Sequence, residues 1–496
     1  MIARSRGRLN SCGLEGSDAT RCFILPATAT YLEDAATVTL ASLLAAFQAS
    51  PRVQRLLDAV RANQQVAISD LPLAARPAVI AAVTASLRRP TLIVTSRDDR
   101  AEQLCNALNE LLPGPSRVEH WPAPDALPYE QLPFDLPTAT QRVAILNRFV
   151  TATEDRWPIV TVSVRGLSHL VMPPEELRRQ THHLHVNDRF DAAQFFEWAT
   201  EAGYQLTPVV QEPGTIARRG GIIDIFPPTA DDPIRIELFG DVIDSIRLFD
   251  PSSQRSRTRL NEATLLPPLE VPLRRLPEAA QAVRQLDLAS LRSEVAAEWE
   301  RMIERMQQGL VPASLDLFAP YLLCPAATLA DYLPDDGLII LDEPGAIRLT
   351  AHQLQEHASE LVAGFVDNGE LPPGLLRPFA IWPEIEASLK QHRQCVLGID
   401  PERPAPIVES LSVVTEAPLY AGRLGRLTED VAQRLGDNWR VVLATDQVER
   451  LTELFEEQNI FPRRDKRRNH AEIVPLQPGT LEIVASDLDG GWMIAE

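Results

Sequence analysis

The stretch Ala217–Asp250, ARRGGIIDIFPPTADDPIRIELFGDVIDSIRLFD, decides the fold of the middle of this chain. From Ile234 to Leu238, apolar and charged side chains alternate strictly, which is typical of an antiparallel strand with one buried face. Gly240 and Asp241 separate this strand from the next apolar run and suit a two-residue hairpin turn. The stretch therefore predicts short antiparallel strands that share one polar face.

Four charged residues project from these predicted strands: Arg219, Arg235, Glu237 and Arg247. Guanidinium and carboxylate groups side by side on a rigid sheet suit a charge-complementary protein interface. The same spacing also fits cross-strand salt pairs on an ordinary surface. The residues alone leave both interpretations open.

On both sides of this stretch, predicted strands and helices alternate. A strand at 66–68, a helix at 77–87, a strand at 91–95 and a helix at 100–112 follow one another, which predicts a parallel sheet. Further strands are expected at 159–164, 338–341, 439–446 and 481–487. We predict an α/β fold of several domains.

An apolar stripe at helical spacing predicts one long helix over 278–308. We expect it to pack on its own domain rather than to form an oligomerising coiled coil. From 365 to 410 the chain is punctuated by prolines, which is typical of a boundary. The expected organisation is a poorly ordered leader at 1–35, a split degenerate NTPase-like α/β domain at 36–171 and 263–365, an inserted α+β domain at 172–262, a linker at 366–410, and a third, truncated α/β domain at 411–496.

The composition excludes several functional classes. The chain has 496 residues, 48 Lys and Arg against 68 Asp and Glu, and a net charge of −20, which argues against non-specific coating of DNA. The five cysteines form no C-x-x-C pair, so neither a disulfide framework nor a cysteine zinc site is expected. No apolar run is long enough to span a membrane. We expect a cytoplasmic monomer.

Leu338–Leu341 is an apolar strand followed by Asp342 and Glu343, the order in which an ATP motor binds magnesium and orients the attacking water. Such a motor also needs a glycine-rich phosphate loop with a lysine. The expected position, from Ser69 and Asp70 to Arg76 and Pro77, has no glycine and no lysine. We therefore predict a degenerate nucleotide site made of Ser69, Asp70, Arg76, Asp342 and Glu343, with no catalytic residue and no cofactor for this chain.

Two other clusters invite a chemical interpretation. His183 and His185 would share one face of a strand, but no nearby cysteine or carboxylate completes a metal-binding set, so no metal is expected. Arg463–Arg468 is strongly basic and could hold phosphate, although a solvated loop explains such a run as well.

The 217–250 stretch resembles the signature R-G-x-h-h-D-h-F-P … S-h-R-x-F-D (h, hydrophobic) shared by transcription-repair coupling factors and the excinuclease protein UvrB. Residues 327–344, including TLADYLPDDGLIILDEP, are similar to the UvrB segment that carries its Asp-Glu strand. Two features favour the coupling-factor family. WPAPDALPYEQLPFDLPTATQR, which ends at Arg142, resembles a passage of that family, and UvrB keeps the phosphate loop that this chain lacks.

The resemblance implies a UvrB-like module that recruits a second excinuclease protein, UvrA, to stalled RNA polymerase in transcription-coupled nucleotide excision repair. In that family, RNA polymerase binding, ATP and Mg²⁺ binding, and translocation on double-stranded DNA reside in later domains, so we expect this chain to be a front section.

The resemblance also implies which residues dock UvrA. Arg219, Arg235 and Glu237 match the family's polar contacts, Phe226 is expected to add an apolar contact, and Arg247 is placed on the same surface. UvrB carries an arginine where this chain has Ala217, so the expectation is either weaker docking or reliance on Arg218. The rival interpretation is a UvrB-like ATPase or DNA-binding repair protein that acts through Asp342 and Glu343.

Overall fold

The computed structural model describes residues 21–25, 40–112, 117–400, 402, 404–420, 422–464, 476–486 and 488–495. Within them, three sheets of six or seven strands and one small two-stranded sheet are joined by helices. This arrangement confirms the predicted α/β class. None of the helices in these ranges is both long and apolar enough to cross a membrane.

The largest sheet has seven parallel strands in the order β16-β2-β15-β14-β3-β5-β4. They are β2 (Gln65–Ser69), β3 (Thr91–Thr95), β4 (Val118–Trp121), β5 (Ile159–Ser163), β14 (Leu338–Asp342), β15 (Arg393–Leu397) and β16 (Val408–Ser410). Most are rich in β-branched and leucine residues, as expected for strands buried on both faces. Segments from both sides of the inserted antiparallel unit therefore build one sheet.

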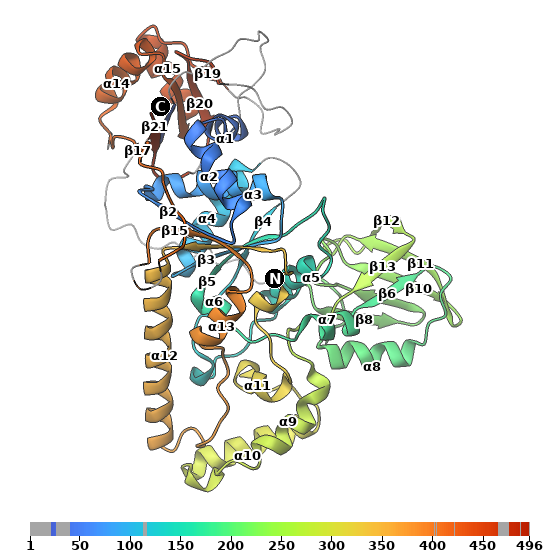
Figure 1. Cartoon of the computed structure of the whole chain (residues 1–496). Coiled ribbons are helices and arrows are strands. Elements are labelled where there is room, and N and C mark those ends of the chain that lie inside the picture. Colours follow the sequence, from blue (N-terminus) through green and yellow to red (C-terminus); the bar gives the residue numbers. More distant parts are fainter. Residues whose placement is uncertain are drawn as a thin grey trace.

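Helices cover both faces of this sheet (Figure 1). Side chains on one face share a core with α1 (Leu40–Gln48), α2 (Pro51–Ala62), α3 (Arg76–Leu87) and α4 (Asp98–Leu111). Those on the other face share a core with a larger set: α5 (Leu136–Val150), α6 (Val164–Leu167), α7 (Pro174–Gln180), α9 (Leu276–Val283), α10 (Ser293–Gln307), α11 (Ala319–Leu322), α12 (Pro344–Asp367) and α13 (Trp382–Leu389).

The antiparallel unit projects to one side of the large sheet, at the right of Figure 1. Its six strands run in the order β12-β11-β10-β9-β8-β7. Their bounds are β7 (Gln205–Leu206), β8 (Thr215–Arg219), β9 (Ile222–Ile225), β10 (Ile234–Phe239), β11 (Val242–Phe249) and β12 (Ser256–Leu260). Helix α8 (Ala192–Ala202) packs on one face through Phe195 and Ala199. The predicted hairpin at Gly240 and Asp241 is confirmed, because Phe239 pairs with Val242.

A two-stranded sheet closes the base of this unit. β6 (His182–His185) pairs antiparallel with β13 (Glu262–Leu265), and Leu184 and Leu265 belong to the same core as α8. The unit therefore extends past residue 262, where we expected it to end.

The third sheet lies at the opposite end of the molecule from α10 (Figure 1). It combines β17 (Val414–Glu416), β18 (Arg440–Thr445), β19 (Arg463–Arg464), β20 (Leu481–Ala485) and β21 (Trp492–Ile494) with β1 (Arg21–Leu25). Helices α14 (Leu424–Gly436) and α15 (Val448–Glu457) pack against it. β1 lies between β21 and β18.

The expected leader and the expected linker both contain regular secondary structure. Residues 21–25 form a central strand of the third sheet rather than a leader, whereas the rest of 1–35 lies outside the described residues. The expected linker at 366–410 holds α13, β15 and β16, and β15 is an inner strand of the large sheet. The prolines described in this range lie at the start of α13 or between the elements, where they do not disturb the ladder.

The helix expected at 278–308 is broken between α9 and α10. The Asp287 side chain accepts a hydrogen bond from the Ala289 backbone N–H (3.2 Å), an alternative to helical pairing. The Arg292 backbone N–H donates to the Gly369 carbonyl (3.0 Å), so a distant segment also holds the break. The apolar stripe does pack on its own core, as expected, through Trp299 and Met306.

Candidate docking face and degenerate nucleotide site

The face of the antiparallel sheet that α8 does not cover carries two rows of side chains across the strands. Strand pairing aligns the first row as Arg219, Ile222, Glu237 and Ser245. It aligns the second as Ala217, Asp224, Arg235, Arg247 and Arg259. The structure thus brings most of the predicted docking residues onto one face, which we call the polar face.

Arg235 is held tightly within this face. Its Nε and Nη2 atoms donate to the two carboxylate oxygens of Asp224 at 2.7 and 2.9 Å, and its guanidinium lies 4.5 Å from the Phe249 ring centre. The Asp224 side chain is only 3% exposed. The hydrogen bonds to Asp224 raise the pKa of Arg235 above its usual value. Arg235 is therefore first a structural residue, because its loss would strand a buried carboxylate.

Glu237 and Arg247 form a more open pair. Ser245 Oγ donates to Glu237 Oε2 at 2.6 Å, and Arg247 Nη2 lies 3.4 Å from the same oxygen. Both side chains are about one-third exposed, so they can contact a partner. Arg259 stands directly opposite Arg247 in the strand pairing, and like charges in that position repel each other. A carboxylate from a partner would relieve this repulsion.

The exposed part of the polar face combines charge with apolar surface. Arg219 is exposed, and its Nη2 donates to the Pro208 carbonyl at 2.7 Å, which orients the guanidinium. Beside it, Ile222 is 36% exposed, and Phe239 at the β10–β11 turn is 82% exposed. The sequence interpretation missed Phe239 and Arg259, although Phe239 stands two residues after Glu237 in the quoted stretch.

Two expected contact residues lie elsewhere. Phe226 is 6% exposed and packs with Val210, Ala217 and Phe249 in a small separate core, so it offers no apolar surface to a partner. Arg218 lies over the Phe196 ring of α8 (5.7 Å), on the other side of the sheet from Arg219. It is therefore not placed to compensate for Ala217.

The five residues of the predicted nucleotide site gather at the carboxyl ends of β2 and β14, where α/β folds bind ligands. Ser69 Oγ and Ser410 Oγ donate to Asp70 Oδ2 at 2.9 and 2.7 Å, and these bonds lower the pKa of Asp70. Asp70 itself adopts a left-handed backbone conformation (φ 56°) in the turn after β2. These contacts tie the turn to β16 and fix a carboxylate in the turn, where a phosphate would be repelled.

Two arginines, Arg76 and Arg100, form ion pairs with the carboxylates of the predicted nucleotide site. Arg76 Nη1 lies 2.5 Å from Asp342 Oδ1, and Arg76 Nη2 lies 3.0 Å from Glu343 Oε1. Arg100 Nε lies 3.0 Å from Asp342 Oδ2. The Asp342 side chain is 3% exposed, so its charge is already neutralised inside the protein. The residues present do not fit ATP and Mg²⁺, because both carboxylates are engaged and the one lysine among the described residues, Lys390, pairs with Glu386 of α13.

No group of three or more His, Cys, Asp or Glu that could hold a metal occurs among the described residues. His185 Nδ1 instead lies 3.2 Å from Asp188, and His183 lies 3.1 Å from the Thr264 hydroxyl. Most of the basic run Arg463–Arg468 falls outside the described residues.

Comparison with known proteins agrees with this geometry. Residues 182–270 match the UvrB interaction domain family. That range contains the whole antiparallel sheet and both β6 and β13.

The chain is also similar to curated transcription-repair-coupling factors. It is 34% identical to that of Myxococcus xanthus over 303 residues, which cover 58% of this chain and 25% of the relative. It is 29% identical to that of Bacillus subtilis over 315 residues (61% and 26%) and 24% identical to that of Escherichia coli over 341 residues (68% and 28%). The aligned part spans about a quarter of each relative. The predicted resemblance is thereby confirmed: residues 182–270 of this chain match the UvrB interaction domain, and the chain is similar over 303–341 residues to transcription-repair-coupling factors.

Proposed function

We propose that this chain is the partner-docking part of a transcription-repair-coupling factor, and that it recruits UvrA through the polar face of its UvrB interaction domain. The observation that carries the proposal is the surface formed by Arg219, Ile222, Glu237, Arg247 and Phe239 within the matched residues. Arginine and aromatic side chains contribute most to binding at protein interfaces.

The surface is built for docking rather than catalysis. The Ser245 hydroxyl that donates to Glu237 is fully buried and is not accessible to a substrate. The charged groups of the surface rest on a sheet whose other face is a packed core. Rigid positioning reduces the entropy lost on binding. In the same proposal, other parts of such a factor displace RNA polymerase and drive movement on double-stranded DNA with ATP.

The proposal also holds that this chain hydrolyses no ATP. Its support is the pairing of Asp342 with Arg76 and Arg100, which leaves no oxygen of Asp342 free for a magnesium ion. The rival ATPase interpretation requires these ion pairs to open.

The test is calorimetric titration of UvrA with the wild-type chain and with Phe239→Ser. Loss of a central aromatic contact should weaken binding by about 1–3 kcal/mol, or roughly 5- to 150-fold in Kd. Phe461→Ser is the matched control, because Phe461 is 75% exposed but lies outside the UvrB interaction domain. Equal affinity of the two variants would refute the assignment of the docking face.

A further inference from the structure

The inserted unit is joined to the large sheet by two chain crossings that run side by side. The outgoing crossing passes through Val171 and Met172, and the returning crossing passes through Glu270. The Met172 backbone N–H donates to the Glu270 carbonyl at 2.8 Å, and Val171 pairs with Ala327 of the main body. We call these two crossings the joint.

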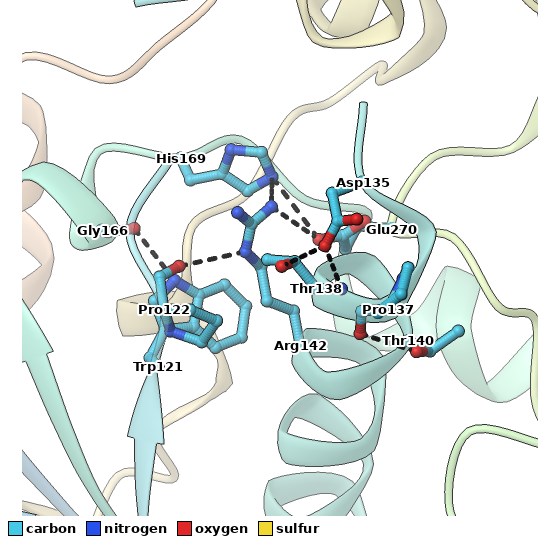
Figure 2. A network of polar contacts seen from close by, with 10 residues as sticks. All are labelled: Trp121, Pro122, Asp135, Pro137, Thr138, Thr140, Arg142, Gly166, His169 and Glu270. Carbon is cyan, nitrogen blue, oxygen red and sulfur yellow. Dashed lines mark hydrogen bonds and ion pairs between the residues drawn. The ribbon is translucent and has the colours of Figure 1, made fainter. Parts of the chain in front are cut away.

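One side chain of the main body reaches into the joint. Figure 2 shows Arg142 of α5 pointing at His169 and Glu270. Its Nη1 lies 3.0 Å from Glu270 Oε1 and 3.0 Å from His169 Nε2, and its Nε donates to the Pro122 carbonyl at 3.1 Å. Arg142, His169 and Glu270 are each only 5–7% exposed. A single guanidinium thus links α5, the end of β4, and both sides of the joint.

Hydrogen bonds that do not involve Arg142 fix the start of α5, the helix that carries it. The Asp135 carboxylate caps the helix by accepting from the Thr138 backbone N–H (3.0 Å) and hydroxyl (2.6 Å). Trp121 Nε1 donates to the Gly166 carbonyl at 3.1 Å and anchors the end of β4 (Figure 2). Arg142 therefore lies on an anchored helix and donates to Pro122, next to the anchored end of β4.

The ion pair at the joint remains charged despite its burial. Burial raises the pKa of Glu270, but the charge of Arg142, with a smaller contribution from His169, outweighs this effect and lowers the pKa below its usual value. A buried ion pair is often no more stabilising than well-packed apolar residues of similar size. Its geometry is directional, however, because a guanidinium donates along fixed directions in one plane.

Hydrogen bonds hold the outgoing crossing to the main body: Val171 pairs with Ala327, and the Tyr332 hydroxyl donates to the Met172 carbonyl at 2.7 Å. Around the returning crossing, apolar contacts add to the ion pair of Glu270. Leu177, Leu266 and Leu269 pack into the core of the main body, and apolar contact does not define a direction. Beyond them, the inserted unit has a core of its own, built around α8 and β8–β11. The core of the unit is therefore separate from that of the main body, and the contacts at the joint connect the two.

We propose that Arg142 is a positioning residue: through Glu270 and His169 it sets the direction in which the UvrB interaction domain projects from the main body. The docking face is carried on that domain, so its direction decides where a bound partner sits relative to the rest of the protein. The proposal concerns this chain alone and holds whether or not UvrA is the partner.

The experiment measures the distance distribution between spin labels, placed as noncanonical residues at Glu197 on α8 and Glu360 on α12. Both positions are exposed and lie on helices of different units. The test variant is Arg142→Met with Glu270→Met, which replaces the ion pair with apolar side chains of similar length. The matched control is Arg178→Met on α7, close to the joint in the chain, because both members of its ion pair with Glu175 are exposed.

We expect a single narrow distance peak for the wild type and the control, and loss of that peak in the double variant at an unchanged melting temperature. If the double variant does not fold, Glu270→Gln, which keeps the size of the side chain but not its charge, should also broaden the peak. A narrow peak in the variant without the charge pair would overturn the proposal, since the other hydrogen bonds and the packing at the joint would then set the direction.

Discussion

Removal of the Arg76 side-chain charge should destabilise the large sheet. Arg76→Met keeps most of the side-chain stem but leaves Asp342, which is 3% exposed, with Arg100 as its remaining ion-pair partner. Breaking a buried ion pair costs about 3–5 kcal/mol, and the retained Arg100 contact reduces the expected loss to about 2–4 kcal/mol. Asp342→Asn in the same chain removes the stranded charge, so the double variant should recover about 1–3 kcal/mol relative to the sum of the single variants.

The assay is hydrogen exchange of the β14 amides across a urea series, because separate units need not unfold together and a single global transition would mix them. Arg61→Met is the control: its pair with Asp58 is exposed, and its loss should change stability by less than about 1 kcal/mol. If Arg76→Met proves as stable as Arg61→Met, or the double variant shows no recovery, then Arg76 does not neutralise Asp342 and the account of the degenerate site is wrong.

Three further predictions follow from buried charges. The folded pKa of Glu270 lies below the ordinary value of 4.5, so the stability contributed by its ion pair is complete above pH 4.5 and is lost as the pH falls through the folded pKa. The protection of the Met172 amide, taken as its exchange rate relative to the intrinsic rate at each pH, should fall only there, and a loss of protection above pH 4.5 would count against it. Burial raises the pKa of Glu482 to about 8, so the folded state loses stability as the pH rises from 4.5 to 8. In urea titrations, Glu482→Gln should have nearly the stability of the wild type in acid and be more stable by a few kcal/mol at alkaline pH. A stability difference between the two proteins that does not change with pH would count against this prediction. Arg235→Ala should destabilise the inserted unit by about 3–5 kcal/mol, because it leaves the buried Asp224 carboxylate without its ion-pair partner. Arg219→Ala should leave the thermal unfolding of the unit unchanged. Equal melting curves for the two variants would show that Asp224 needs no partner.

Local pattern was sufficient to predict much of the fold. β3 occupies the residues expected for it, and the β10–β11 hairpin turns where Gly240 and Asp241 predicted it. Both signals depend on near neighbours in the chain. The order of the large sheet could not be predicted in the same way, since β15 inserts between β2 and β14 through contacts that are distant in sequence. The break before α10 depends on Gly369 for the same reason.

For the candidate site, too, prediction succeeded where near neighbours in the chain decide the structure and failed where distant contacts decide it. Alternation in the quoted stretch correctly placed Arg235 and Glu237 on one face, but it could not show that Asp224 already engages Arg235. Phe226 was expected to be exposed, yet a residue from a separate loop, Val210, helps to cover it. Phe239 keeps the alternation of Arg235 and Glu237, because the irregular pairing after Glu237 adds its extra residue to β11. Alternation could therefore have indicated the face of Phe239, but not its exposure at the turn.

The most direct test of the central claim uses two adjacent residues on opposite sides of one strand. UvrA is titrated with the wild-type chain, Arg219→Ala and Arg218→Ala, and ATP turnover is followed in control samples of each chain without UvrA. The account predicts that Arg219→Ala weakens binding by about 1–3 kcal/mol, that Arg218→Ala binds like the wild type, and that no chain hydrolyses ATP. Undiminished binding by Arg219→Ala, or turnover by the chain alone that disappears in Glu343→Gln, would contradict it.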